Sequence, residues 1–276
     1  MERSRGRSEV NVGVIDGPVF MQHPDLNHER LRELTGRHSS ICGGANGAAC
    51  MHGTFVTGIL AAKRSSAAPA ICPDCTILIR PIFADASVGV EGMPSATQQQ
   101  LAAAIVECID RGARVINLSL AVVGRSSHGE ELLEDALQQT VKRGVIVVAA
   151  AGNQGTLGSS ILTRHPWVIS VVACDLRGYP IRESNLGRSI GQRGLSAPGD
   201  RIASLGAEGG SLTLGGTSVA VPFVTGAIAL LLSEFPSASA ADVRLAVSRA
   251  SAARRASVVP PLLDASAAYH ALSTRI

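Results

Sequence analysis

The chain has 276 residues, of which 46% are hydrophobic, 17% are charged and only 3% are aromatic. This length and apolar content suit one large domain, in which roughly three quarters of the unfolded surface becomes buried. The formal net charge is +3, and the arginines are scattered rather than gathered in a basic stripe, so we expect no nucleic-acid partner.

The N-terminal region carries no recognisable targeting segment. Residues 1–9 are polar and rich in arginine, and no apolar segment of a signal peptide follows them. The apolar run at 219–232 is too short for a membrane span and contains Pro222. We therefore expect a cytoplasmic protein with no membrane partner, whose six cysteines are free thiols.

Predicted strands and helices alternate along the chain. Residues 10–15 form a β-branched run that predicts a buried strand, and the strand ends at Asp16 before a Gly-Pro turn. The other predicted elements are strands at 76–83, 114–120, 145–150, 167–174 and 201–205, helices at 52–62, 98–111, 131–143, 219–232 and 239–249, and a Pro/Gly loop at 194–200. This alternation predicts an α/β fold, a three-layer sandwich with a mostly parallel central sheet.

A Cys-x-x-Cys sequence at 72–75 stands immediately before the strand at 76–83. Such a pair can hold zinc or act in redox chemistry, but a four-ligand zinc site would need a second, suitably spaced pair. A redox motif normally opens a helix, whereas this one precedes a strand. We interpret it as a tight turn with two thiols, and we expect neither a metal ion nor a cofactor.

Four polar residues stand at element ends that should face one edge of the sheet. Asp16 ends a strand, His52 is expected at the start of a helix, Asn153 follows the strand at 145–150, and Ser218 opens a buried helix. Each has an ordinary structural alternative, such as a turn aspartate or a helix-capping serine in a Gly-rich turn. Together they form the set that a serine hydrolase needs: a nucleophile, a base, an orienting carboxylate and an oxyanion donor.

Four segments resemble the motifs of the subtilisin-like (subtilase) serine proteases, in that family's Asp, His, Asn, Ser order. They are residues 12–17 (VGVIDG), 52–58 (HGTFVTG), 150–155 (AAGNQG) and 216–222 (GTSVAVP). The resemblance spans about residues 10–272 and implies one subtilisin-like catalytic domain, with tails at 1–9 and 273–276. It implies a serine endopeptidase whose catalytic residues are Asp16, His52, Ser218 and Asn153.

The same resemblance implies where a peptide or protein substrate lies. An extended peptide would pair with the segment at 118–121. The first specificity pocket would have residues 119–121 on one wall and the turn at 151–153 on the other, with 159–163 near its base. The implied substrate-binding residues are Leu118, Ser119, Leu120, Ala121, Ala151, Gly152 and Gln154.

A narrower likeness concerns the substrate. Because Asp16 lies so near Met1, we expect no propeptide of the usual size before it. Residues 16–19, 80–83 and 195–199 are most similar to the cyanobactin-maturation proteases, which cut a leader from a precursor peptide. We therefore predict a serine endopeptidase that processes a ribosomal precursor peptide through an acyl-enzyme.

Three alternatives stay open beside this prediction. The first is a general intracellular protein-degrading protease of the same family. The second is a catalytically inactive peptide-binding module. An esterase of the α/β-hydrolase type is the weakest, because it needs Gly-x-Ser-x-Gly and the order Ser, Asp, His, whereas the serine comes last here.

Overall fold

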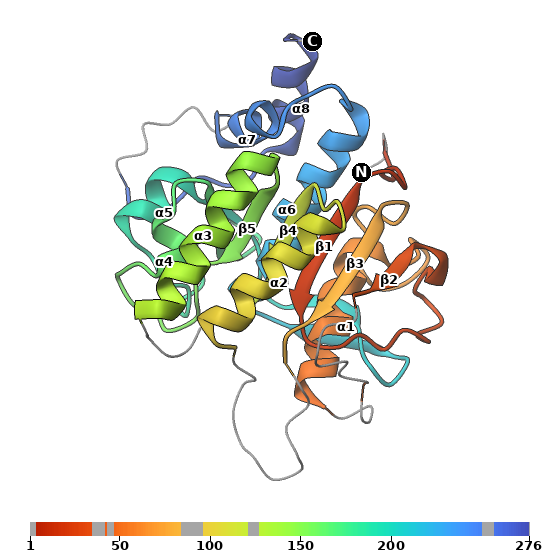
Figure 1. Cartoon of the computed structure of the whole chain (residues 1–276). Helices are drawn as coiled ribbons and strands as arrows, with labels where there is room; N and C mark the ends of the chain where they lie inside the picture. The colour runs from red at the N-terminus through yellow and green to blue at the C-terminus, as the bar shows by residue number, and fades with distance from the viewer. Residues whose placement is uncertain are drawn as a thin grey trace.

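The computed structural model describes residues 4–34, 42, 47–83, 96–120, 127–249 and 257–275. Within these ranges the middle layer is a seven-stranded sheet in the order β2-β3-β1-β4-β5-β6-β7 (Figure 1). Its strands are β1 (Asn11–Asp16), β2 (Leu31–Glu33), β3 (Thr76–Pro81), β4 (Val115–Leu118), β5 (Ile146–Ala150), β6 (Val168–Cys174) and β7 (Leu195–Pro198). All six pairings between neighbouring strands are parallel, which confirms the predicted α/β class.

Helices cover both faces of this sheet. In Figure 1, α2 (Gln98–Asp110) and α3 (Ser127–Arg143) lie on the near face, and α6 (Thr217–Glu234) lies behind the sheet. The remaining helices are α1 (Ala48–Ala61), α4 (Ile161–Arg164), α5 (Arg188–Arg193), α7 (Ala240–Arg249), α8 (Ala265–Ser273) and the 3-10 turn η1 (His28–Arg30). Because helices cover both faces, an inner strand such as β5 is a continuous apolar run rather than an alternating one.

Successive residues of β1 illustrate the two cores. Val12 and Val14 belong to the same cluster as Val224 of α6. Ile15 points to the opposite face, into the cluster that contains Leu101 of α2 and Leu133 of α3. Side chains alternate between the faces of a strand, so β1 contributes to both cores and ties the three layers together.

Helix α6 is the central helix of the fold, as predicted from its apolar sequence. Its length and composition would also suit a membrane span, but 78% of that stretch is buried by the rest of the chain. Gly216 caps its N-terminus, and Ser218 lies in its first turn. The helix therefore presents Ser218 at the carboxyl edge of the sheet from within the core.

Strands β7 and β8 (Ile202–Leu205) differ from the prediction. Residues 195–198, expected in a loop, form strand β7, which pairs with β6. Strand β8 lies outside the main sheet, in an antiparallel pair with the unpredicted β9 (Ser211–Leu214). The Pro and Gly residues near β7 favour a loop locally, but pairing with a buried neighbour outweighs that preference.

The expectation of six free thiols is wrong for two cysteines. Cys42 and Cys50 form a disulfide, because α1 brings Cys50 to a Cα–Cα distance of 5.5 Å from Cys42. Disulfides persist mainly in oxidising compartments, so this bond does not support the expected cytoplasmic location, which stays a prediction. The other four cysteines are free and buried: Cys72, Cys75, Cys108 and Cys174.

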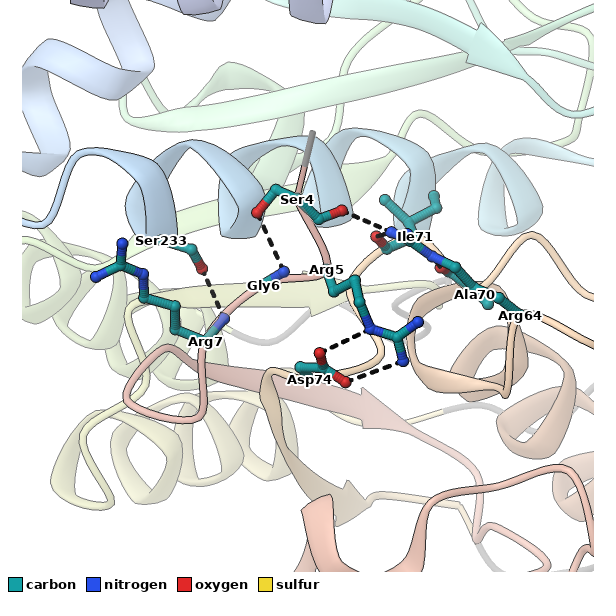
Figure 2. Close-up of polar contacts among 9 residues, drawn as sticks. All are labelled: Ser4, Arg5, Gly6, Arg7, Arg64, Ala70, Ile71, Asp74 and Ser233. Carbon is teal, nitrogen blue, oxygen red and sulfur yellow. Dashed lines mark hydrogen bonds and ion pairs between the residues drawn. The ribbon is translucent and has the colours of Figure 1, made fainter. Parts of the chain in front are cut away.

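The segment before β1, predicted as a tail, is anchored to the body of the protein (Figure 2). Arg5 Nε donates to Asp74 Oδ2 at 2.8 Å, within the Cys-x-x-Cys sequence at 72–75. The backbone N–H of Arg7 donates to Ser233 Oγ of α6 at 3.1 Å. A hydrogen bond of 3.0 Å from the N–H of residue 75 to the carbonyl of residue 72 closes the tight turn that the sequence predicted.

Candidate active site

The turn after β1 packs directly against helix α1, and this contact brings Asp16 beside His52. A Cβ atom on Gly17 would lie 2.0 Å from the carbonyl oxygen of Ala49, and one on Gly53 would lie 2.4 Å from that of Pro18. Only glycine permits so close an approach of two backbones. His52 lies inside α1, which begins at Ala48, rather than at the helix start as predicted, because the alanine-rich segment before it extends the helix.

His52 joins the carboxylate of Asp16 to the hydroxyl of Ser218. Its Nδ1 lies 2.7 Å from Asp16 Oδ1, and its Nε2 lies 3.0 Å from Ser218 Oγ. Asp16 is 1% exposed, and its Oδ1 also accepts the N–H of Gly17 at 2.7 Å. A carboxylate only accepts hydrogen bonds, so Nδ1 carries the proton and Nε2 offers its lone pair to the hydroxyl.

The surroundings of His52 set its proton affinity. Burial lowers the pKa of His52, whereas the charge of Asp16 and the hydrogen bond to Asp16 raise it, and the resulting pKa lies above the ordinary value. Asp16 therefore stabilises the imidazolium form. That form arises when a histidine base takes the proton of a serine nucleophile.

The carboxamide of Asn153 is oriented by Thr217. Asn153 Oδ1 accepts the backbone N–H of Thr217 at 2.8 Å and its hydroxyl at 2.9 Å. A backbone N–H is always a donor, so this contact identifies the amide oxygen and leaves the NH₂ group as a donor. Thr217 is not among the predicted site residues. Its position directly before Ser218 in the serine motif could have indicated that it belongs there.

A cavity of about 300 Å³ lies where these groups meet. Its lining residues are Asp16, Ala49, His52, Phe83, Ser119, Leu120, Ala150, Gly152, Asn153, Gln154, Thr217 and Ser218. They include all four predicted catalytic residues and four of the predicted substrate-binding residues. A larger hollow of about 670 Å³ beside α3 and α4 contains none of the four predicted catalytic residues.

The other predicted substrate-binding positions lie elsewhere. Leu118 and Ala151 are buried in the core and do not line the cavity. Residues 159–163, expected near its base, are also outside its lining. Ala121 falls outside the described residues. Conversely, Phe83 and Ala49 line the cavity although they were not predicted to do so. No pattern in the neighbouring sequence indicates this, because the two residues come from different elements.

Asn185 supports the turn that carries Asn153. Its Oδ1 accepts the N–H groups of Gln154 at 3.0 Å and Thr156 at 3.1 Å. Its Nδ2 donates to the carbonyl of Ala151 at 3.3 Å and to Gln154 Oε1 at 2.6 Å. Sequence reasoning missed this residue, because a lone asparagine far along the chain carries no pattern that marks the contact.

The described part of the chain holds no group of three or more His, Cys, Asp or Glu residues that could bind a metal ion. The chemistry available at the cavity is that of a hydroxyl, an imidazole, a carboxylate and a carboxamide. Joined in this order at the carboxyl edge of a parallel sheet, these groups define the class of the serine hydrolases. The chain belongs to the subtilase family, Peptidase S8, whose profile matches residues 7–267.

Known proteins of this family resemble the chain over most of its length. Subtilisin DY of Bacillus licheniformis is 30% identical over 243 residues, which cover 86% of this chain and 81% of the relative. A subtilisin of Bacillus sp. strain TA39 is 29% identical over 270 residues. That match covers 88% of this chain, but the chain spans only 61% of that relative's length.

Solved structures agree with this fold. A mutant of the protease domain of PatA, a patellamide maturation protease, has a TM-score of 0.87 and 31% identity, covering 100% of this chain and 99% of that one. The prenylagaramide maturation protease PagA has a TM-score of 0.82 and 29% identity, covering 98% and 96%. These matches confirm the subtilisin-like fold and the predicted likeness to the cyanobactin-maturation proteases.

Proposed function

We propose that this protein is a serine endopeptidase that cuts a ribosomal precursor peptide through an acyl-enzyme. The observation that carries this proposal is the unbroken hydrogen-bonded chain from Asp16 through His52 to Ser218 Oγ, with distances of 2.7 Å and 3.0 Å. A serine hydroxyl is a weak nucleophile until an adjacent base takes its proton, and this chain supplies the base.

In the acylation step, Ser218 Oγ attacks the carbonyl carbon of the scissile bond while its proton passes to His52 Nε2. Asp16 stabilises the resulting imidazolium from the Nδ1 side. The carbonyl oxygen becomes an oxyanion, which accepts hydrogen bonds from the NH₂ group of Asn153 and the backbone N–H of Ser218. The C–N bond then breaks as His52 returns the proton to the leaving amine.

In the deacylation step, water takes the place of the amine. His52 removes a proton from the water, whose oxygen attacks the ester carbon and forms a second oxyanion. The bond to Ser218 Oγ breaks, and His52 returns the proton to that oxygen. The products are one new carboxyl terminus and one new amino terminus, and the enzyme is unchanged.

The likeness to two maturation proteases supports a precursor peptide as the substrate. PatA and PagA are 31% and 29% identical to this chain and cover nearly all of it. The alternative within the same family is a general protein-degrading protease. The two differ in selectivity, because a maturation protease must spare most peptide bonds.

The catalytic assignment is tested with Ser218→Ala and a fluorophosphonate that labels activated serines. We expect the wild-type protein to become labelled and to cleave peptides, and we expect Ser218→Ala to lose both properties. Ser211→Ala is the matched control, because Ser211 is an exposed serine in β9. Cleavage retained by purified Ser218→Ala contradicts the mechanism, and an unlabelled, inactive wild-type chain favours a peptide-binding module.

The substrate class is tested by digesting a synthetic peptide library and an unfolded protein side by side. A precursor-processing protease should cut few library members, at a shared sequence, and leave most bonds of the unfolded protein intact. Broad digestion of both would instead support the general protease.

A further inference from the structure

Pro222 leaves the backbone carbonyl of Ser218 without its usual helical partner. In an α-helix each carbonyl accepts a hydrogen bond from the N–H four residues further on, and proline has no N–H. The carbonyl of Ser218, a half-buried residue, is therefore free to accept a hydrogen bond from outside α6. Ser119 provides one: its Oγ donates to this carbonyl at 2.8 Å.

Ser119 is the last member of a buried chain of hydrogen bonds. The hydroxyl of Thr225 donates to Asn117 Oδ1 at 3.0 Å, and Asn117 Nδ2 donates to Ser119 Oγ at 2.8 Å. Thr225 and Asn117 are 0% exposed, and Ser119 is 2% exposed. All three donors point the same way, from Thr225 towards Ser218, so each bond polarises the next.

The chain attaches helix α6 to the central sheet at two places. Thr225 and Ser218 both lie on α6, whereas Asn117 lies in β4 and Ser119 directly follows that strand. The backbone of Ser218 is thus held relative to β4, while its side chain faces His52 on α1 at 3.0 Å. Holding one end of the residue restricts where its hydroxyl can lie.

We propose that Ser119, Asn117 and Thr225 are positioning residues for the nucleophile: they hold the Ser218 carbonyl that Pro222 leaves open, and so aim Ser218 Oγ at His52. This inference rests on the proposed function of Ser218. Asn117 and Thr225 are not among the residues that line the cavity, so they act on the reaction through Ser218 rather than through substrate.

The first test is rescue by Pro222→Ala. Ser119→Ala removes the donor and should lower kcat roughly tenfold, since small misplacements of reacting groups are costly. Pro222→Ala restores an N–H that can bond to the Ser218 carbonyl within the helix. The double variant should therefore regain most of the lost kcat and of the lost rate of fluorophosphonate labelling. A double variant no faster than Ser119→Ala overturns the proposal.

Measuring KM separates positioning from substrate contact, because Ser119 also lines the cavity. A lost substrate contact raises KM, and Pro222→Ala, buried in α6, would not restore it. The positioning role predicts that Ser119→Ala lowers mainly kcat and that Pro222→Ala restores it. A change confined to KM contradicts it.

The second test uses two buried threonines. Thr225→Val keeps the side-chain shape but removes the first donor, and it should lower kcat severalfold. Thr57→Val is the matched control, because Thr57 is also 0% exposed and its hydroxyl has no hydrogen-bond partner among the described residues. We expect wild-type kcat from Thr57→Val, and equal kcat values for the two folded variants contradict the proposal.

The two proposals fail in different ways. An inactive, unlabelled wild-type chain would remove the proposed peptidase function and this inference with it. An active wild-type chain whose Thr225→Val variant is unimpaired, or whose Ser119→Ala variant is not rescued, would remove only the positioning role. Circular dichroism and thermal unfolding establish that each compared variant is folded.

Discussion

The backbone N–H of Thr217 donates a hydrogen bond to Oδ1 of Asn153 at 2.8 Å. Thr217 is the first residue of α6 and directly precedes Ser218. The helix end that presents the hydroxyl therefore also turns the NH₂ group of Asn153 away from Thr217. This contact ties together two groups, from separate elements, that act on the same carbonyl in the proposed mechanism.

The first prediction separates the two halves of the Asn153 carboxamide. Asn153→Asp keeps an oxygen that accepts from Thr217 but replaces the NH₂ donor, and Asn153→Ala removes both. Loss of an oxyanion donor costs roughly 10²–10³ in kcat, a magnitude known from subtilisin. We expect both variants to lose this much in steady-state assays, with little change in KM. Near-normal kcat in Asn153→Asp would exclude the amide as an oxyanion donor.

The second prediction concerns pH. The kcat/KM value requires neutral His52, so it should fall as pH drops through a pKa that Asp16 holds above the usual value of about 6.5. Asp16→Asn removes the negative charge that raises the pKa of His52, but His52 stays buried. The pKa of His52 should therefore fall. The acid limb of the pH profile should therefore move to lower pH. An acid limb that stays in place would show that another group controls it.

Asp16→Asn should also lower kcat, by roughly 10⁴, because an amide at this place can favour the wrong imidazole tautomer. Measuring kcat at the pH optimum of each variant separates this loss from the change in protonation. Activity within tenfold of the wild-type protein would contradict the role given to Asp16.

The third prediction concerns the anchored N-terminal segment (Figure 2). Gly6 has a φ of +88°, and an added Cβ would lie 2.4 Å from Cys75 Sγ. Gly6→Ala should destabilise the protein by about 1–2 kcal/mol through the backbone, and further through this steric conflict. Gly209→Ala is the control, because Gly209 has a φ of +87° and no atom within 4 Å of an added Cβ. Urea unfolding should show the larger loss for Gly6→Ala; equal losses would contradict the packing against Cys75.

The fourth prediction concerns the Cys42–Cys50 disulfide. These cysteines are 8 residues apart. Closing so short a loop should stabilise the folded state by about 2.5 kcal/mol on the chain-entropy account. Cys42→Ala/Cys50→Ala should therefore lower the unfolding free energy by about that amount. Dithiothreitol should lower the Tm of the wild-type protein and leave that of the double variant unchanged.

Alkylation of the denatured protein tests the same bond directly. Four thiols should react without prior reduction, and all six should react after it, in keeping with the free cysteines in the structure. Mass spectrometry counts the added groups. Six modified cysteines without reduction would show that the disulfide is absent.

Much of the fold follows from local patterns in the sequence. The apolar run before Asp16 and the run at 145–150 could be interpreted as buried strands, because a sheet covered on both faces needs apolar side chains in both directions. Strand β7 could not be predicted in this way. Its four residues include a proline, and pairing with strand β6 on one side and with residues 261–263 on the other makes an extended conformation favourable there.

The sequence by itself determined the class of the protein, because the four motifs and their order can be identified without any knowledge of the structure. Only the tertiary structure decided that Cys42 pairs with Cys50, that Thr217 orients Asn153, and that Ser119 takes the carbonyl left open by Pro222. Each of these contacts joins residues from different elements, or from a loop and a helix. Their energies depend on distances that the folded chain alone sets, so no local pattern of residues reveals them.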